Sequence, residues 1–214
     1  MKLVTEKADK NSLAIIAKCY IDAFPNSISA KLGENYIKHN LGWFLEDEMK
    51  ILFYIKEDNK CIGFCGGYLW TKIGDGSTSS MINYSKKIRN KILLSKPWLL
   101  LNFETIIKIF KFLIIKFKLT FLRNKSVEIN LQRNESSLGL VVIGVNPNYK
   151  GKGIANLLIQ QFEKFGADKD INWAHLSVRK ENSRAINFYK KNGWEITSIG
   201  KSNEDTFSFK KQLK

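Results

Sequence analysis

The stretch Val141–Ala155, which reads VVIGVNPNYKGKGIA, decides the fold of this chain. Its first part belongs to the short apolar run Leu140–Val145, which is typical of a buried strand. Pro147 ends the strand because proline has no N–H to donate to a sheet. Two glycines follow, and an apolar helical periodicity begins at Ile154. The stretch therefore predicts a strand, a glycine-rich loop and a helix in direct succession.

The glycine-rich loop has the features of an anion-binding site. Gly151 and Gly153 carry no side chain that would keep a ligand from the main chain, and the first N–H groups of the next helix have no partner within it. A helix start of this kind favours phosphate. Lys150 and Lys152 add positive charge, so a diphosphate fits better than a neutral ligand. A Gly-x-Gly turn alone is weak evidence, and further motifs have to identify the ligand.

Two familiar phosphate-binding loops are excluded by the residues around these glycines. A P-loop requires Gly-Lys-Ser/Thr at the helix start, whereas Gly153 is followed here by Ile154 and Ala155. A dinucleotide-binding fingerprint requires a third small residue where this chain has Asn156. The loop therefore belongs to another class.

The loop resembles the acetyl-CoA loop of the GNAT superfamily of N-acetyltransferases, whose pattern is Arg/Gln-x-x-Gly-x-Gly/Ala. Lys150, Gly153 and Ala155 occupy the three defining places, with Lys150 replacing the usual Arg or Gln. A second family signature, Asn-x-x-Ala-x-x-x-Tyr followed by Gly-Phe, is matched by Asn182, Ala185, Tyr189 and Gly193-Trp194. The resemblance covers residues 137–214 well and residues 1–70 more weakly.

The order of the expected elements agrees with this family. We expect strands at Lys2–Thr5, Ile51–Ile55, Cys61–Trp70, Leu140–Val145, Asn172–Arg179, Trp194–Ile199 and Thr206–Lys210. We expect helices at Asp9–Phe24, at Ser27–Phe44 with breaks near Gly33 and Gly42, at Ile154–Phe165 with Gly166 as C-cap, and at Arg184–Lys191 with Ser183 as N-cap. The resemblance implies an α/β fold, a GNAT-like mixed sheet of about seven strands flanked by helices. It also implies that the fourth and fifth strands splay apart.

The resemblance further implies an acetyl-CoA site along this stretch. The pantetheine arm would pair with exposed main-chain groups near the end of the fourth strand, and the loop amides would hold the diphosphate. Gly144, within that strand, is consistent with a bulge or a close backbone approach. The implied cofactor-binding residues are Ile143, Gly144, Val145, Lys150, Gly151, Lys152, Gly153, Ile154, Ala155 and Asn182.

Acetyl transfer needs a neutral amine, a stabilised oxyanion and a proton for the departing thiolate. The resemblance assigns the proton to Tyr189; by spacing alone, Tyr189 is an aromatic residue that packs its helix on the sheet beside Phe188. The base stays unassigned, because Gly139 stands where many relatives carry a glutamate. The other groups considered, each more simply a surface or packing residue, are Glu34, His39, Glu46, Asp47, Glu135 and His175.

Composition fits a single domain with one core, since the chain has 214 residues of which 44% are hydrophobic. Cys61 and Cys65 are expected to be buried thiols, and with only two histidines in the chain we expect no metal site. The first residues carry charges where a signal peptide would have an apolar segment. We therefore expect a cytoplasmic protein.

Residues 71–136 depart from the family as a basic, mainly helical insertion in the single 1–214 domain. Gly74–Ser80 is polar and loop-like, and from Lys86 to Lys125 eleven basic residues face only Glu104, which accounts for ten of the net charge of +15. Phe103–Leu122 has an apolar and a basic helical face, with lysines that exclude an ordinary membrane span. Three interpretations remain for it: packing over the acceptor side, a contact in a homodimer, or contact with the anionic inner surface of a membrane.

The sequence therefore predicts an N-acetyltransferase that moves acetyl from acetyl-CoA to a primary amine. The basic insertion favours an anionic small-molecule acceptor such as an amino sugar, and a peptide or protein amine is the nearer competitor. A non-catalytic basic module that binds a membrane surface or nucleic acid is the alternative of another class. Nucleic acid is disfavoured because the aromatic residues of the insertion lie at helical core spacing.

Overall fold

The computed structural model describes residues 3–70, 77–96, 136–197 and 205–214. At its centre lies one seven-stranded sheet with the strand order β1-β2-β3-β4-β5-β7-β6. Neighbouring strands are antiparallel except for the parallel pair β4 and β5. The strands are β1 (Thr5–Lys7), β2 (Lys50–Glu57), β3 (Lys60–Trp70), β4 (Ser137–Val145), β5 (Trp173–Arg179), β6 (Glu195–Thr197) and β7 (Thr206–Gln212). The mixed α/β sheet expected from the sequence is confirmed.

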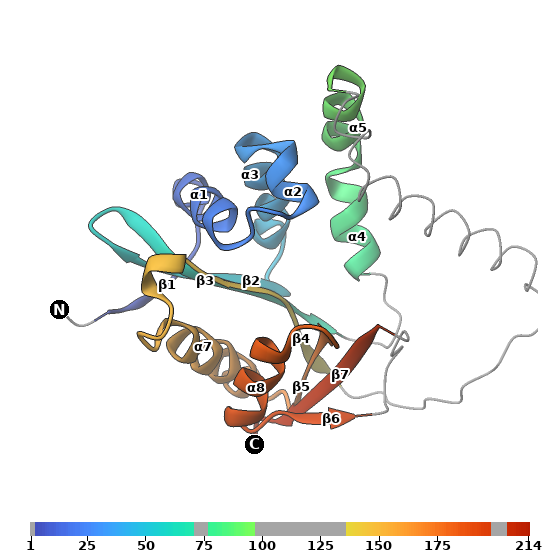
Figure 1. Ribbon diagram of the computed structural model, residues 1–214. Coiled ribbons are helices and arrows are strands. Elements are labelled where there is room, and N and C mark those ends of the chain that lie inside the picture. Colours follow the sequence, from blue (N-terminus) through green and yellow to red (C-terminus); the bar gives the residue numbers. More distant parts are fainter. Residues whose placement is uncertain (1–2, 71–76, 97–135, 198–204) are drawn as a thin grey trace, which may run out of the picture.

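Helices cover both faces of the sheet (Figure 1). One face, called the α1 face, carries α1 (Leu13–Ala23), α2 (Ile28–Leu32), α3 (Glu34–Gly42) and the short 3-10 helix η1 (Trp43–Leu45). The opposite face, called the α7 face, carries α7 (Ile154–Asp168) and α8 (Ser183–Lys191). Two further helices, α4 (Ser77–Tyr84) and α5 (Lys86–Ser95), lie beside α2 and α3.

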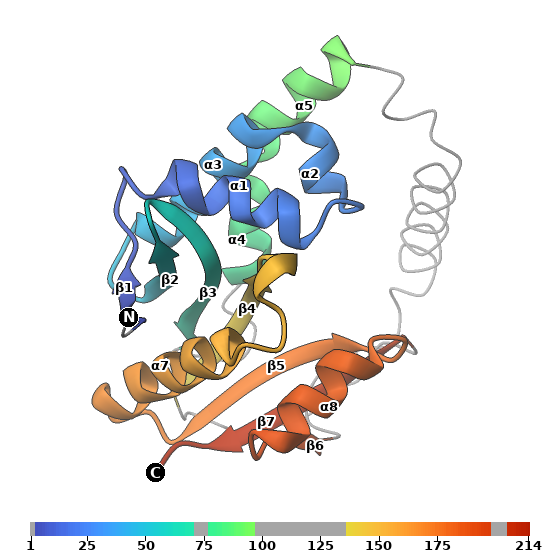
Figure 2. The ribbon, with the colours of Figure 1, turned by 60° about the vertical axis from the view of Figure 1, so that its left-hand side comes forward.

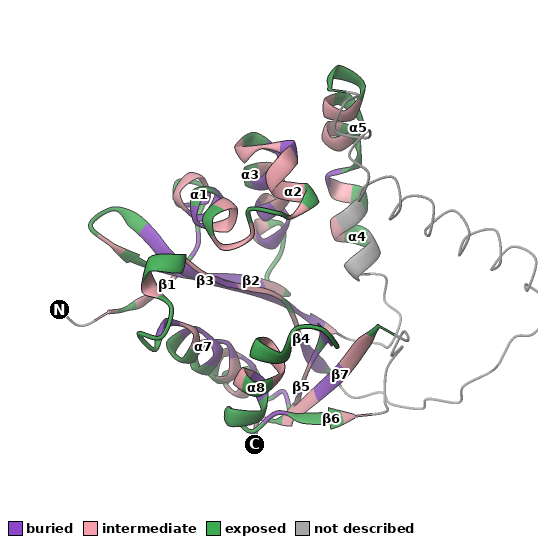
Figure 3. Cartoon of the chain, viewed as in Figure 1, coloured by how far each residue is buried: buried purple, intermediate pink, exposed green. Residues whose placement is uncertain are grey.

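Each face has its own hydrophobic core, and the buried residues line the sheet and the helix sides turned toward it (Figure 3). The α7 core is built around Leu138, Leu158, Phe162 and Phe209, all without exposed side chain. The α1 core includes Ile16, Ile37, Leu41, Trp43, Phe44 and Phe64. Cys61 and Cys65 are free and buried, as expected, and so is Cys19.

The expected splay between the fourth and fifth strands is present (Figure 2). β4 and β5 pair only at Ser137 with Trp173, Leu138 with Ala174 and Gly139 with His175. Beyond Gly139, β4 continues to Val145 and pairs only with β3 among the described residues. One edge of β4 is therefore open along its second half.

A β-bulge interrupts the pairing of β3 and β4. Gly66 pairs with Val142 and Gly67 with Leu140, so Val141 is the extra residue. Gly144 does not lie at the bulge. It lies where an aromatic side chain comes close to the strand backbone. A methyl group there would lie 2.7 Å from the ring of Phe64, which packs with Phe24 over this part of the strand.

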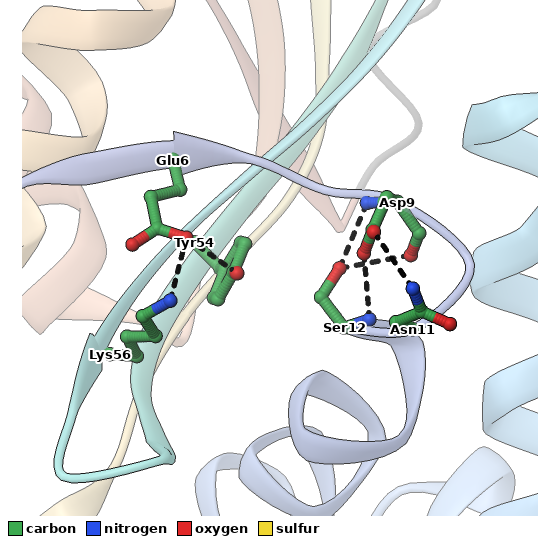
Figure 4. A network of polar contacts seen from close by, with 6 residues as sticks. All are labelled: Glu6, Asp9, Asn11, Ser12, Tyr54 and Lys56. Carbon is green, nitrogen blue, oxygen red and sulfur yellow. Dashed lines mark hydrogen bonds and ion pairs between the residues drawn. The ribbon is translucent and has the colours of Figure 1, made fainter.

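The start of the chain differs from the prediction, because β1 is Thr5–Lys7 and not Lys2–Thr5. Pairing with β2 fixes its position: Glu6 lies opposite Tyr54 and accepts hydrogen bonds from the Tyr54 hydroxyl at 2.8 Å and from Lys56 at 3.0 Å (Figure 4). These contacts come from residues nearly fifty positions away, which local hydropathy does not report. The prediction followed the apolar residues at the beginning of the chain and therefore placed the strand too early.

The entry to α1 is held by two reciprocal hydrogen bonds (Figure 4). The Ser12 N–H donates to the Asp9 carboxylate, and the Asp9 N–H donates to the Ser12 hydroxyl, both at 2.8 Å. Asp9, predicted as the helix start, thus organises the turn before α1, and the helix itself begins at Leu13.

Two predicted helix caps are wrong. Gly166 lies inside α7, which continues to Asp168; it is a packing glycine, because a methyl group there would lie 2.5 Å from Leu213. The N-cap of α8 is Asn182 and not Ser183, since the Asn182 side chain accepts the Ala185 N–H at 3.1 Å. The breaks near Gly33 and Gly42 are confirmed by the ends of α2 and α3.

The described part of the insertion is helical. Residues 77–80, expected in a loop, belong to α4, which with α5 packs on the α1 core through Met81, Tyr84, Ile88, Ile92 and Leu93. The predicted helix Phe103–Leu122 and the turn between β6 and β7 lie outside the described residues. Within the described ranges, no helix has both the length and the apolar character needed to cross a membrane.

Candidate functional site

The loop between β4 and α7 has the backbone shape that its glycines suggest. A short 3-10 helix, η3 (Pro147–Tyr149), follows β4. Gly151 has φ 82° and Gly153 has φ 79°, both in the left-handed region that favours glycine. Gly153 is the N-cap of α7, and no side chain caps this end of the helix.

This loop presents a cluster of free backbone donors. The first N–H bond into α7 runs from Leu157 to the Gly153 carbonyl at 3.1 Å. In the described part of the chain, five main-chain N–H groups before it have no hydrogen-bond partner, those of Gly151, Gly153, Ile154, Ala155 and Asn156. These groups also lie at the positive end of a fifteen-residue helix, which is the arrangement that binds anions in proteins generally; the loop is therefore the candidate anion site.

Two lysines accompany these amides. Both Lys150 and Lys152 are exposed. The Lys152 ammonium lies 4.7 Å from the centre of the Tyr149 ring, within the range of a cation–π interaction. The structure thus brings together the expected loop residues, from Lys150 to Ala155, at one end of the open β4 edge.

The loop is anchored by residues that sequence reasoning missed. The Asn146 side chain donates to Asp22 of α1 at 2.9 Å and accepts the Asn148 N–H at 3.1 Å. The Tyr149 hydroxyl donates to the Glu57 carboxylate at the end of β2. Asp22 and Glu57 lie far from the loop in sequence, and no motif marks them; Tyr149 stands inside the loop motif but has no assigned place in it.

Ile143, Gly144 and Val145 lie on the stretch of β4 that β5 leaves unpaired. The side chains of Ile143 and Val145 pack against the α7 core. These three residues lead directly into η3 and the loop, so the open strand edge and the anion site are continuous.

Tyr189 lies deep in the α7 core. It is 5% exposed, and its ring packs against Trp194 and Phe209 at centroid distances of 5.8 and 5.9 Å. Burial raises the pKa of the Tyr189 phenol, and Cys65 of β3 contributes a smaller increase, so the group is a neutral proton donor near pH 7. Tyr189 belongs to the same core as Ile143 and Val145, which lie on the open half of β4. None of the described residues forms a hydrogen bond with its hydroxyl.

A surface groove of about 900 Å³ lies along α8 and reaches the first turn of α7 at Asn156. Its lining includes Asn156 from α7 and three cations of α8, Arg184, Lys190 and Lys191. Sequence reasoning did not select these cations, although their clustering on the short helix α8 was a usable signal. Asn182, expected to help hold the cofactor, caps the same helix.

The groups weighed as a base are mostly partnered elsewhere. His39 stacks on Tyr84 at 4.7 Å, and Asp47 pairs with Lys50 at 2.7 Å. Gly139, at the place where many relatives carry a glutamate, is covered by the Trp70 indole: a methyl group there would lie 2.6 Å from Trp70 Nε1. His175 stacks on the same indole at 6.1 Å, at the point where β4 and β5 part. Glu34 and Glu46 belong to the α3 and η1 region, and Glu135 lies outside the described residues.

Comparison with known proteins agrees with this geometry. Residues 126–194, which span β4, the loop, α7, β5 and α8, match the model of the acetyltransferase (GNAT) family. This part of the chain is similar to the GNAT family. An acetyltransferase of Pectobacterium atrosepticum is 40% identical to the chain over 53 residues, which are 25% of the chain and 38% of that protein. The chain thus matches well under half the length of this curated relative.

Solved structures resemble the chain over nearly its full length. A GNAT acetyltransferase from Desulfovibrio desulfuricans superposes with a TM-score of 0.60 at 8% identity, covering all of both chains. The PaiA N-acetyltransferase from Thermoplasma acidophilum, crystallised with coenzyme A, superposes with a TM-score of 0.56 at 14% identity and covers 99% of both chains. At these identities the likeness shows a shared fold.

Proposed function

We propose that this chain transfers an acetyl group from acetyl-CoA to a primary amine. One observation carries the proposal: five backbone N–H groups that have no partner among the described residues lie beside two lysines at the end of an open strand edge. This combination suits a ligand with a diphosphate at one end and an extended, amide-bearing arm at the other. Acetyl-CoA has both parts.

In this proposal the loop binds the diphosphate through the amides from Gly151 to Ala155, with Lys150 and Lys152 balancing its charge. The pantetheine arm pairs with the open edge of β4 near Ile143 and Val145. The third phosphate of acetyl-CoA, on its ribose, would lie in the basic groove along α8, which reaches the first turn of α7 at Asn156. Asn182, at the N-cap of α8, borders the same ligand.

The chemistry needs few protein groups. The neutral amine attacks the thioester carbonyl, a C–N bond forms and the C–S bond breaks, and the amine gives up a proton. The leaving sulfur takes its proton from Tyr189. Burial raises the pKa of Tyr189 and keeps the phenol protonated near pH 7, so it has a proton to give to the sulfur while the C–S bond breaks.

For the acceptor we propose an anionic small molecule such as an amino sugar. The described basic residues of the insertion support this choice, since Lys86, Lys87, Arg89 and Lys91 all belong to α5, which packs beside α2 and α3 of the α1 face. A peptide or protein amine is the competing acceptor. Release of free CoA, measured with amino sugars, their nucleotide conjugates and short peptides, separates the two.

Calorimetry with acetyl-CoA tests the donor assignment. We expect micromolar binding, and we expect Gly151→Ala to weaken it about 5- to 10-fold, because a side chain at φ 82° costs about 1–2 kcal/mol and shifts the loop amides. Gly33→Ala is a matched control: Gly33 has φ 98°, and neither glycine has an atom within 4 Å of the added methyl group. Absence of binding at tens of micromolar acetyl-CoA would contradict the proposed enzymatic activity and favour a non-catalytic basic binding module.

A further inference from the structure

The loop lysines differ in how they are held. Lys152 contacts Tyr149 twice: its N–H donates to the Tyr149 carbonyl at 3.3 Å, and its ammonium lies 4.7 Å from the Tyr149 ring. Lys150 has no ion-pair or ring partner among the described residues. One cation of the anion site is therefore placed by the fold, and the other is free to move.

Tyr149 is itself fixed from outside the loop. Its hydroxyl donates to Glu57, which ends β2, while its N–H donates to the Asn146 carbonyl at 2.9 Å. Glu57 also raises the pKa of Tyr149 through this bond, which keeps the phenol a hydrogen-bond donor. A carboxylate on the hydroxyl makes the ring more electron-rich, and the ring then attracts a cation more strongly.

We propose that Tyr149, held by Glu57, is a positioning residue that keeps the Lys152 ammonium at the diphosphate end of the acetyl-CoA site. The inference rests on the proposed function and deepens it. A lysine side chain loses about 2 kcal/mol of rotamer entropy when it is ordered, so a lysine that is already held binds a phosphate at lower cost. Lys152 would then contribute more to diphosphate binding than the equally charged Lys150.

A double-mutant cycle on acetyl-CoA binding tests this role. We expect Lys152→Ala to weaken binding about 10-fold, as for a lost charge-assisted hydrogen bond, and Tyr149→Leu to weaken it about 3-fold, as for a lost exposed cation–π contact. If Tyr149 acts through Lys152, the double variant binds about as weakly as Lys152→Ala alone. A purely structural role of Tyr149 predicts multiplication of the two effects, to about 30-fold.

The ligand and the variant can both be matched to controls. Pantetheine, which lacks the diphosphate, should compete equally well with acetyl-CoA in the wild type and in Tyr149→Leu. Tyr54→Phe removes another phenol bonded to a carboxylate, Glu6, on the outer strands (Figure 4), and it should leave the dissociation constant unchanged. Tyr149→Phe keeps the ring and should fall between the wild type and Tyr149→Leu.

The outcomes separate this inference from the function on which it rests. A wild type that does not bind acetyl-CoA overturns the proposed function. A wild type that binds, with multiplicative effects in the cycle, overturns only the role of Tyr149. Tighter binding by Tyr149→Leu does the same, because the ring would then hold Lys152 away from the phosphates. If Tyr149→Leu does not fold, the cycle of Tyr149→Phe with Lys152→Ala decides in its place.

Discussion

The α7 face and the α1 face of the sheet differ in what they offer to a ligand. On the α7 face the groups assigned to acetyl-CoA come from one segment, β4 to α8, and in the described part of the chain five backbone N–H groups of this segment have no partner. On the α1 face, side-chain contacts join the region of α3 and η1 to that of α4 and α5: Trp43 donates to Ser80 at 3.3 Å, Ser85 donates to Asn40 at 2.7 Å, and His39 stacks on Tyr84. The assigned site on the α7 face thus uses backbone donors, whereas these contacts of the α1 face are made by side chains.

The difference explains why one substrate is easier to identify than the other. Backbone amides around a glycine-rich turn bind a diphosphate in any protein that forms the turn, so a short motif is enough. The α1 face joins the α3 region to the inserted helices α4 and α5 through the side-chain contacts of Ser85, Trp43 and His39. These contacts belong to no motif in the sequence, so the acceptor proposed for this face has to be identified by experiment.

The largest effect is expected for Tyr189, the proposed proton donor on the α7 face. Tyr189→Phe should lower turnover about 100-fold or more, the usual contribution of a general acid, and leave acetyl-CoA binding nearly unchanged. Tyr36→Phe is the matched variant on the other face, because burial likewise raises the pKa of Tyr36. It should leave turnover within about twofold by the same reasoning. Unchanged turnover in Tyr189→Phe would show that Tyr189 packs in the core and donates no proton in the reaction.

Two adjacent glycines of β3 sharpen the comparison of the two cores. A methyl group at Gly67 would lie 2.3 Å from the Gly139 carbonyl and 2.5 Å from Phe162 on the α7 face, whereas at Gly66 it would meet only side chains, Phe44 at 2.8 Å first. We expect Gly67→Ala to cost about 3 kcal/mol and Gly66→Ala about 1 kcal/mol, because side chains yield more easily than backbone. Urea denaturation measures both, and equal midpoints would contradict the prediction.

The smallest effects are expected for substitutions at the N-termini of two helices, α8 and α1. Asn182→Ala, at α8, and Ser12→Ala, at α1, should each lower the free energy of unfolding by about 1 kcal/mol. Only Asn182→Ala should also weaken acetyl-CoA binding, by a few-fold, because only α8 borders the proposed ligand. Calorimetry on both variants checks this, and parallel behaviour would remove Asn182 from the site.

The entry to α1 also has a defined pH dependence. Hydrogen bonds from Ser12 lower the pKa of Asp9 below its ordinary value of about 3.9. The folded state thus favours ionised Asp9, so its stabilising contribution is present above about pH 4 and is lost as the pH falls through the lowered pKa. The stability difference between the wild type and Asp9→Asn, which cannot ionise, should therefore shrink in acid, as denaturation at several pH values would measure.

Local signals were sufficient where the chain's own neighbours determine the structure. Gly151 and Gly153 were enough to predict the loop. Two apolar stretches joined by a polar turn predicted β2 and β3, and an alternating pattern predicted β5, each to within a few positions. Errors occurred where partners are distant. β1 is placed by its pairing with β2, and Gly166 is packed against Leu213, so neither can be located from adjacent residues.

The candidate site divides in the same way. The residues of the loop, Tyr189 and Asn182 follow from two short motifs, but Asp22 and Glu57 reach the loop only after the sheet and α1 have assembled. Both residues lie about a hundred positions or more from the loop in the sequence, so the motif does not point to them. Such anchoring residues become visible only when the tertiary contacts are known.

At the Val141 bulge, the alternation of β4 side chains between the two faces of the sheet shifts by one residue. Before it, the even-numbered Leu138 and Leu140 face the α7 core; after it, the odd-numbered Ile143 and Val145 do. The even-numbered Val142 and Gly144 then face the α1 core. Any alignment that places a gap in this strand must therefore put it at the bulge, because a gap elsewhere would exchange the residues assigned to the two faces.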